Sequence, residues 1–322
     1  MTLPILRVSA PFAPHTITKV EHLLELLAEI HERQYLKPRL ALHGGTALNL
    51  FHLDLPRLSV DIDLLYVGDP SREGMLAERP RVRQELEDLF RKLGYRYAEP
   101  RDEHAGVTYK LVFRTAWGED MIKVDLNFLN RAPLLGFVPR TCRHCEPTVT
   151  FNVIAFPELV AGKVKALAER RSAAIRDLYD LYQVAGLPLE DRALLKALII
   201  YYWALADTFP RVLDGAIVDR FADAGPALES ELFPVLHPND RIQLETMIEK
   251  VGAFLGRFAD LEPEEAKFLD LLASEGDYQP ELLFDRWPEV LKRARISPAA
   301  AWKVKNLGRR PGSTPPKDNL PD

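Results

Sequence analysis

Several features are scarce in this sequence, and each scarcity argues against a class of protein. Only two of the 322 residues are cysteines, too few for a disulfide-stabilised secreted domain. The longest apolar runs fall far short of the roughly 20 residues that a membrane helix needs. The N-terminus has no basic segment followed by a long apolar run, so we expect no signal peptide. We therefore expect a cytoplasmic protein that does not engage a membrane.

The two cysteines, Cys142 and Cys145, form a single C-x-x-C segment. Such a segment is half of a zinc site, and no second cysteine pair completes it. A redox pair would begin a helix, whereas Pro147 and an expected strand follow here. We favour two free thiols, with a weak metal or redox site as the alternative.

The chain also lacks an overall positive charge. Its net charge of −5 gives no general indication of nucleic-acid binding. The segment from Lys292 to Lys317 nevertheless contains eight basic residues and no acidic one. This segment could follow a phosphate backbone. It could equally be a solvated tail, because its end, "RRPGSTPPKDNLPD", is rich in proline and glycine.

Hydrophobic periodicity divides the chain into two parts. Residues 1–155 alternate between strands and helices, which predicts a mixed α/β domain. Residues 156–307 are helical in pattern, and residues 308–322 are expected to be a disordered tail. We expect strands at 39–45, 58–67, 106–116, 121–129 and 148–156, and helices at 16–34, 46–53 and 80–94. Further helices are expected at 157–187, 191–209, 240–261, 263–276 and 280–296.

Two carboxylates lie close together on the expected strand "LSVDIDLLYV". Alternate residues of a strand share a face, so Ser59, Asp61 and Asp63 point one way. The residues between them, such as Ile62, point into the core. Two neighbouring carboxylates repel, and burying them costs several kcal/mol unless something pairs with them. A divalent metal bound by Asp61 and Asp63 would supply that partner.

A third carboxylate, Asp125, lies in the later strand "IKVDLNF". There Val124 and Leu126 are expected in the core, which leaves Asp125 on the opposite face. If the two strands are neighbours, three carboxylates converge. Oxygen ligands of this kind suit Mg²⁺, with Mn²⁺ as the alternative, and such ions also bind substrate phosphates. Two ions can clamp the attacking and leaving oxygens of a phosphoryl displacement.

A glycine turn precedes these carboxylates. Gly44 and Gly45 lie between an expected strand and a helix that opens at Thr46. Without side chains, the glycines let backbone N–H groups approach a triphosphate, and the helix N-terminus adds partial positive charge. A glycine turn, a helix, a strand with D-x-D and a later carboxylate together favour a nucleotide-binding enzyme.

This arrangement resembles that of the DNA polymerase β-like nucleotidyltransferases. Within that superfamily, the segments "GGTALNLF…RLSVDIDLL" and "ELVAGKVKALAERRSAAIRDLYDLY" are similar to the AbiEii/MenT toxins of toxin–antitoxin and phage-defence pairs. The resemblance covers residues 40–185 and departs in a longer stretch between Gly45 and Asp61. It implies a nucleotidyltransferase fold, an NTP substrate and an RNA acceptor, most plausibly the 3′ end of a tRNA. It also implies a cognate antitoxin as partner.

The resemblance implies roles for single residues. Asp61 and Asp63 would hold the metals, and Ser59 would lie near the nucleotide phosphates. Lys163 would reach the triphosphate, and Asp177 matches the late catalytic aspartate. The remaining matches are Arg176, a phosphate or RNA contact, and Asp125, the third carboxylate of the wider superfamily.

Each assignment has a structural alternative. The D-x-D pair could protect an edge strand, Ser59 could be an ordinary strand residue, and Lys163 could be a solvated helix residue. Asp177 could cap a helix or pair with Arg176. Two neighbours are interpreted structurally: Asp180, at i+3 from Asp177, as a surface carboxylate, and His43 as a partly buried histidine.

The positions of Lys163 and Asp177 make a geometric prediction. On one unbroken helix their 14-residue separation would span about 21 Å along the axis, too far for one site. We therefore expect one helix to end near Arg171 and a second, capped by Ser172, to turn back. Both groups should then lie within about 10 Å of the Asp61 carboxylate, which leaves room for metal, water and phosphate.

Two other functions stay open at this point. One is nucleotide transfer to a small molecule, as in antibiotic-resistance enzymes. The other is a non-catalytic binding module on the same fold, against which the joint presence of D-x-D, Lys163 and Asp177 argues.

Overall fold

The computed structural model describes residues 3–8, 12–170, 174–209 and 214–307. Its centre is a seven-stranded mixed sheet with the strand order β4-β5-β6-β3-β2-β9-β7. The strands are β2 (Leu40–His43), β3 (Asp61–Tyr66), β4 (Arg101–Glu103), β5 (Gly106–Thr115), β6 (Gly118–Asn127), β7 (Phe137–Cys142) and β9 (Val149–Ile154). A separate two-stranded sheet joins β1 (Ile5–Leu6) to β8 (Cys145–Glu146).

The sheet contains both parallel and antiparallel pairs of neighbouring strands. β3 runs parallel to β6 and antiparallel to β2, while β2 runs parallel to β9. β5 and β6 form a long hairpin, in which Thr115 pairs with Gly118 around a two-residue turn. β7 is an edge strand, antiparallel to β9.

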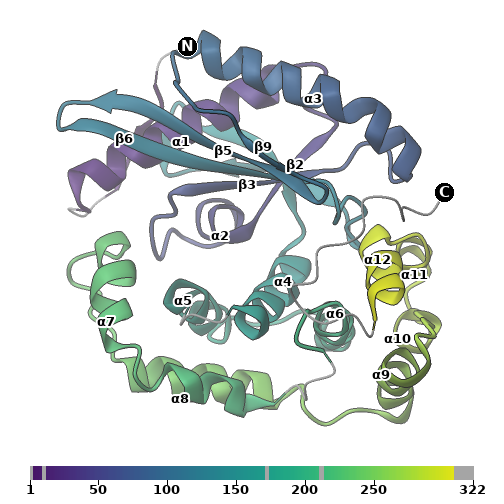
Figure 1. The fold of residues 1–322 in the computed structure, drawn as a ribbon. Coiled ribbons are helices and arrows are strands. Elements are labelled where there is room, and N and C mark those ends of the chain that lie inside the picture. The colour runs from purple at the N-terminus through teal and green to yellow at the C-terminus, as the bar shows by residue number, and fades with distance from the viewer. Residues whose placement is uncertain (1–2, 9–11, 171–173, 210–213, 308–322) are drawn as a thin grey trace.

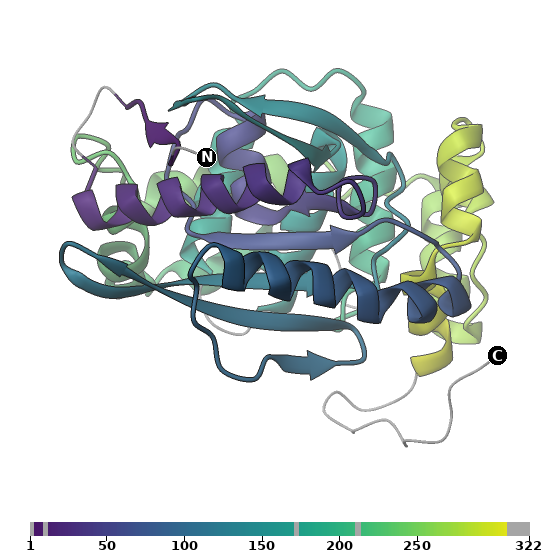
Figure 2. The same cartoon turned by 90° about the horizontal axis from the view of Figure 1, so that it is seen from above.

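Helices cover both faces of the sheet (Figure 1). α1 (Pro14–Glu32) and α3 (Arg72–Lys92) lie over one face, where Figure 2 shows them side by side across the strands. The opposite face carries α2 (Gly44–Thr46), the π-helix η1 (Ala47–His52), α4 (Phe156–Glu169) and α5 (Ile175–Val184). The layers bury a continuous apolar core that includes Leu27, Leu42, Ile62 and Val124.

The remaining described helices follow α5 along the chain and lie on the same side of the sheet as α4 and α5 (Figure 1). They are α6 (Arg192–Ala204), η2 (Gly215–Phe221), α7 (Gly225–Ala227), η3 (Leu228–Leu232), η4 (Phe233–Val235), α8 (Leu244–Gly256), α9 (Pro263–Glu275), α10 (Glu281–Phe284), α11 (Pro288–Arg295) and α12 (Pro298–Asn306). Within the described ranges, no helix is long and apolar enough to cross a membrane.

The expected fold class, a mixed sheet with helices followed by C-terminal helices, is confirmed. The domain boundary at residues 155/156 stays a prediction, because α4 and α5 lie directly on the sheet (Figure 1). The expected disordered tail, residues 308–322, lies outside the described residues.

Some element boundaries differ from expectation. α3 begins at Arg72 rather than Pro80, because Ser71 caps it by accepting a hydrogen bond from the Gly74 N–H, and Pro80 is accommodated inside the helix. The expected helix at 46–53 is instead the short α2 continued by the π-helix η1.

Candidate functional site

A row of polar residues crosses the middle of the sheet on one face. His43 on β2 pairs in register with Asp63 on β3, and Asp63 pairs with Asp125 on β6. Thr108 on β5 continues the row opposite Asp125. The alternating residues Ile62 and Val124 are fully buried on the other face, as the strand pattern predicts. The sheet therefore brings Asp63 and Asp125 side by side.

Asp125 already has partners within the protein. Its carboxylate accepts a hydrogen bond of 2.6 Å from the Thr108 hydroxyl and forms a short ion pair with Lys123. Asp61 and Asp63 differ, because no side chain among the described residues donates a hydrogen bond to either carboxylate. Burial raises the pKa of Asp63; His43 and Lys163 oppose this shift, while Asp61 and Asp125 add to it. A cation at Asp61 and Asp63 would relieve the repulsion.

The donor set supports this inference. Carboxylate oxygens are the ligands that hard divalent cations prefer, so Asp61 and Asp63 fit such an ion. In the described part of the chain, no three His, Cys, Asp or Glu side chains are grouped closely enough to hold a metal. A metal here would thus be coordinated by two protein carboxylates together with substrate and water. Asp125 would keep its ion pair with Lys123.

The glycine turn packs tightly against this carboxylate row. Gly44 has φ +74°, and a Cβ there would lie 2.0 Å from Oδ2 of Asp63. A Cβ on Gly45 would lie 2.8 Å from Nη2 of Arg57 and 3.7 Å from Nζ of Lys163. The glycines are therefore needed because Asp63 and Arg57 occupy the space that side chains at 44 and 45 would fill, while Lys163 lies at ordinary contact distance.

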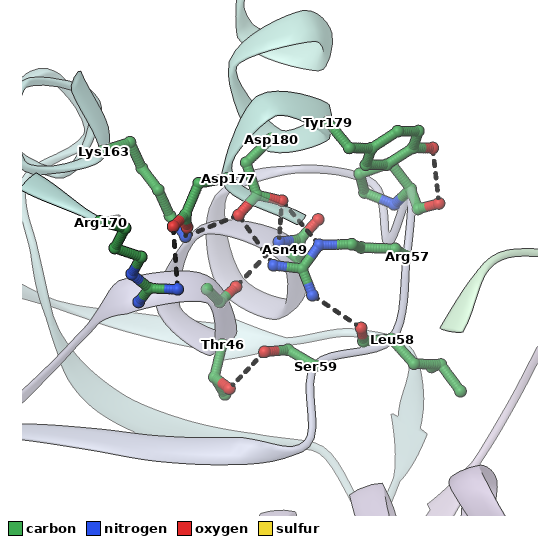
Figure 3. A network of polar contacts seen from close by, with 12 residues as sticks. Thr46, Asn49, Arg57, Leu58, Ser59, Lys163, Arg170, Asp177, Tyr179 and Asp180 are labelled. Carbon is green, nitrogen blue, oxygen red and sulfur yellow. Dashed lines mark hydrogen bonds and ion pairs between the residues drawn. The ribbon is translucent and has the colours of Figure 1, made fainter. Parts of the chain in front are cut away.

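Thr46 and Ser59 tie the turn to the D-x-D strand (Figure 3). The Thr46 hydroxyl lies 2.5 Å from the carbonyl oxygen of Asp61 and 2.9 Å from the Ser59 hydroxyl. Since the Thr46 proton goes to the carbonyl, the Ser59 hydroxyl donates to Thr46. Both side chains are buried, so their present role is to hold the turn against β3.

Lys163 on α4 lies at the centre of a buried ion network (Figure 3). Its ammonium is 2.7 Å from a carboxylate oxygen of Asp177 and 2.7 Å from one of Asp180. Arg170 at the end of α4 also lies 3.1 Å from Asp177. Only 8% of Lys163 is exposed, so the interpretation as a solvated helix residue is wrong.

Asp180 is the most buried member of this network. It is fully buried and accepts two hydrogen bonds from Arg57, of 2.7 and 2.8 Å, and one of 2.9 Å from Asn49. Burial alone would raise the pKa of Asp180, but Arg57 and Lys163 outweigh it and hold the pKa well below its usual value. The expectation of a surface carboxylate is wrong. Neither Arg57 nor Asn49 was foreseen, because only the fold brings them to Asp180.

The helix carrying Lys163 ends before the segment that carries Asp177, as expected. α4 ends at Glu169 and α5 begins at Ile175, so the chain turns back and lets two residues 14 positions apart form an ion pair. The proposed Ser172 cap lies outside the described residues. The expected distance of both groups from Asp61 stays a prediction.

Part of this site lines a cleft of about 260 Å³ between the sheet and α4. His43, the glycine turn, Asp63, Lys163 and Asp177 belong to its lining. The wall of the cleft also includes Asn130, Pro133, Glu158 and Tyr202. Glu158, which the sequence did not single out, accepts hydrogen bonds from the N–H groups of Leu134 and Leu135 and from the Tyr202 hydroxyl, so it braces that wall.

Other candidates are not part of the cleft lining. Arg176 is half-buried and has no polar partner among the described residues. Cys142 and Cys145 are free and buried, and the Cys145 thiol donates to the Cys142 carbonyl at 3.7 Å. Part of the basic C-terminal stretch is used in packing: Arg293 donates to the Pro133 carbonyl and Lys303 to the Ala206 carbonyl.

Comparison with known proteins adds independent findings. No curated protein matches the sequence significantly. The solved structures that match include two from Helicobacter pylori, a candidate nucleotidyltransferase and JHP933. The first is 16% identical with a TM-score of 0.49 and covers 77% of this chain and 96% of its own. The second is 14% identical with a TM-score of 0.48 and covers 77% and 94%.

The family comparison covers most of the chain, including every residue of the cleft's ion network. The description "Nucleotidyl transferase AbiEii toxin, Type IV TA system" matches residues 25–278. Such toxins imply an NTP substrate and a cognate antitoxin. The chain belongs to the AbiEii nucleotidyltransferase toxin family.

Proposed function

We propose that this protein transfers a nucleoside monophosphate from an NTP to a hydroxyl of RNA, at the 3′ end of a tRNA, and releases pyrophosphate. The observation that carries the proposal is the meeting of three elements in one cleft. The unpaired Asp63 carboxylate, the glycine turn and the Lys163 ammonium all line it. This combination suits a polyphosphate and its counter-ion better than an uncharged ligand.

The cation site belongs to Asp61 and Asp63 in this proposal. They would hold Mg²⁺ or Mn²⁺, which when bound stabilises negative charge on the reacting oxygens. Both carboxylates must be ionised to serve as ligands, although burial raises the pKa of Asp63.

The polyphosphate would lie against the glycine turn. Lys163 would supply positive charge there, because its Nζ would be only 3.7 Å from a Cβ on Gly45. Ser59 and Thr46 would fix the turn from beneath through their hydroxyl contact. Arg176, on the first turn of α5, would contact a phosphate of the nucleotide or of the RNA.

The acceptor hydroxyl attacks the α-phosphorus in line, and a carboxylate takes its proton. We assign this role to Asp125, because it is in register with Asp63 on the same sheet face. Asp177 has a different role in this proposal. It is paired with Lys163 and Arg170, so it holds the lysine towards the turn.

The transfer would inactivate the acceptor tRNA in the cytoplasm, and the cognate antitoxin would prevent this in the resting cell. The experiment is incubation of the purified protein with each labelled NTP, Mg²⁺ and total RNA. Label in tRNA supports the proposal. Label in small molecules alone, or transfer to no acceptor with any NTP, contradicts it. An Asp63→Asn variant serves as the control for contaminating transferases.

A further inference from the structure

A second hollow lies next to the cleft, on the edge of the sheet. It encloses about 510 Å³ between η1 and the edge strand β7 with the turn that follows it. We call it the Arg140 groove. Its lining residues are 50–54, 139–141, 143 and 144.

The Arg140 groove carries unpaired positive charge. Arg140 and Arg143 are both exposed, and the described part of the chain offers neither of them an ion-pair partner. The groove's single acid, Asp54, is fully exposed and lies 3.3 Å from His144. His52 adds no charge, because burial lowers its pKa to about 4. The two arginines therefore dominate the potential of the groove.

The groove and the cleft share a wall. His52 lines the groove, and its Nε2 lies 3.0 Å from the carbonyl oxygen of Ile154, which lines the cleft. η1 also joins them along the chain, since it follows the glycine turn directly and ends at His52. Both hollows thus lie around the same short segment of chain.

The register of β7 and β9 gives the distance between Arg140 and the cleft. Phe137 pairs with Ile154 at the cleft, and Arg140 pairs with Phe151 three residues further along β7. At about 3.3 Å per residue, Arg140 lies about 10 Å from the cleft end of the strand. A short stretch of polynucleotide covers that distance. A small-molecule acceptor held at the cleft does not.

We propose that the Arg140 groove binds backbone phosphates of the acceptor RNA, upstream of the hydroxyl that reacts in the cleft. The inference rests on the proposed function and extends it, because it assigns a polymeric acceptor its own binding site. Arginine is well suited to this task, since its planar guanidinium contacts phosphate oxygens in pairs. An acidic protein would be drawn by the same charge. RNA fits better, because the groove is concave and shares a wall with the cleft.

The test compares two double variants of equal charge change. Arg140→Glu/Arg143→Glu reverses the charge of the groove. Arg257→Glu/Arg286→Glu reverses the charge of two exposed arginines, one directly after α8 and one between α10 and α11, that have no ion-pair partner among the described residues. Both are titrated with a labelled single-stranded RNA by fluorescence anisotropy at several salt concentrations, and NTP binding is measured separately.

The groove variant should bind RNA about 20-fold or more weakly at 0.1 M salt, while the control stays within about twofold of the wild type. The neutral variant Arg140→Gln/Arg143→Gln should lower the slope of log K against log salt by about 1.4, the value for two lost contacts to a single strand. NTP binding should be unchanged in all three. Because Arg140 and Arg143 are exposed, the melting temperature of each groove variant should equal that of the wild type. If the Glu variant melts at a lower temperature, the Gln variant alone is used for the RNA-binding comparison.

Three results would overturn the proposal: an unchanged salt slope, an equal loss in the control variant, or a loss of antitoxin binding with RNA binding intact. These results are independent of catalysis. A wild-type protein that transfers nothing to RNA would contradict the proposed function, but the binding comparison would still decide whether the groove holds RNA.

Discussion

Two pairs of aspartates lie close together in this molecule, and their surroundings are opposite. Asp61 and Asp63 receive no side-chain hydrogen bond from the described residues, and the pKa of Asp63 is raised by burial. Asp177 and Asp180 lie beside Lys163, and Arg57 also binds Asp180 through two hydrogen bonds. Uncompensated carboxylates prepare a site for a cation, whereas compensated ones hold other groups in place. In the proposed function the first pair would therefore bind a cation, whereas the second pair holds Lys163 and Arg57 in place.

The largest effect should come from the uncompensated pair. Asp61→Asn or Asp63→Asn should lower nucleotide transfer by at least about 1000-fold, because each removes a charged ligand from the reacting centre. The melting temperature without added metal should stay level or rise, because carboxylate repulsion is relieved. Transfer of a radiolabelled nucleotide measures the activity, and thermal melting measures the stability. Near-normal transfer in either variant would show that Asp61 and Asp63 do not bind a cation that the reaction needs.

The compensated pair should behave in the opposite way. Asp180→Ala removes the carboxylate that pairs with Arg57 and leaves the guanidinium buried. It should therefore lower the free energy of unfolding by about 3–5 kcal/mol. Urea unfolding measures this loss. The matched control is Asp177→Ala, which leaves the Arg57 contacts intact and should cost less. If Asp180→Ala proves as stable as the wild type, Asp180 does not hold the network together.

The same pair predicts a dependence on pH. Because the folded-state pKa of Asp180 is lowered, its contribution is complete above the unfolded pKa of about 3.9 and is lost as the pH falls towards the folded value. Acid unfolding of Asp180→Ala should therefore be shallower below about pH 4 than that of the wild type. Parallel curves would show that another carboxylate controls acid stability.

The sequence predicted the first pair better than the second. The alternation of "SVDIDL" fixes Asp61 and Asp63 on one face of a strand, because a one-residue shift would bury both. The break between α4 and α5 followed from the length of a helix. Arg57 and Asn49 carry no local signal, and they reach Asp180 across 123 and 131 residues of chain. Local periodicity cannot reveal a partner that only tertiary packing supplies.

Other elements were missed for related reasons. β7 has four consecutive exposed residues, so it lacks the alternation that marks a half-buried strand. The π-helix η1 has the apolar composition of an ordinary helix, so periodicity alone does not distinguish the two. The Arg140 groove lies between these two elements, so it could not be predicted before the structure was known.

A glycine substitution tests whether the position of the Asp63 carboxylate matters for transfer. Gly44→Ala places a Cβ 2.0 Å from Asp63 and strains a positive φ, whereas Gly94→Ala strains a similar φ of +79° with no atom within 4 Å. Each should lose about 1 kcal/mol of stability from the backbone strain. Only Gly44→Ala should also displace Asp63, and we expect it to lower transfer about 100-fold. Equal activity in the two variants would mean that Asp63 tolerates movement.

The smallest effect is expected at Arg176, which belongs to neither pair. It is half-buried and has no polar partner among the described residues, so Arg176→Ala should change the free energy of unfolding by less than about 0.5 kcal/mol. If Arg176 contacts a phosphate, the same variant should weaken NTP or RNA binding about tenfold, the value of one charge-assisted hydrogen bond. Isothermal titration with an NTP and anisotropy with RNA separate the two ligands. Arg192→Ala, which removes an exposed arginine at the start of α6, is the control. Unchanged affinity for both ligands would make Arg176 an ordinary surface residue, and phosphate binding would then fall to Lys163 and the glycine turn.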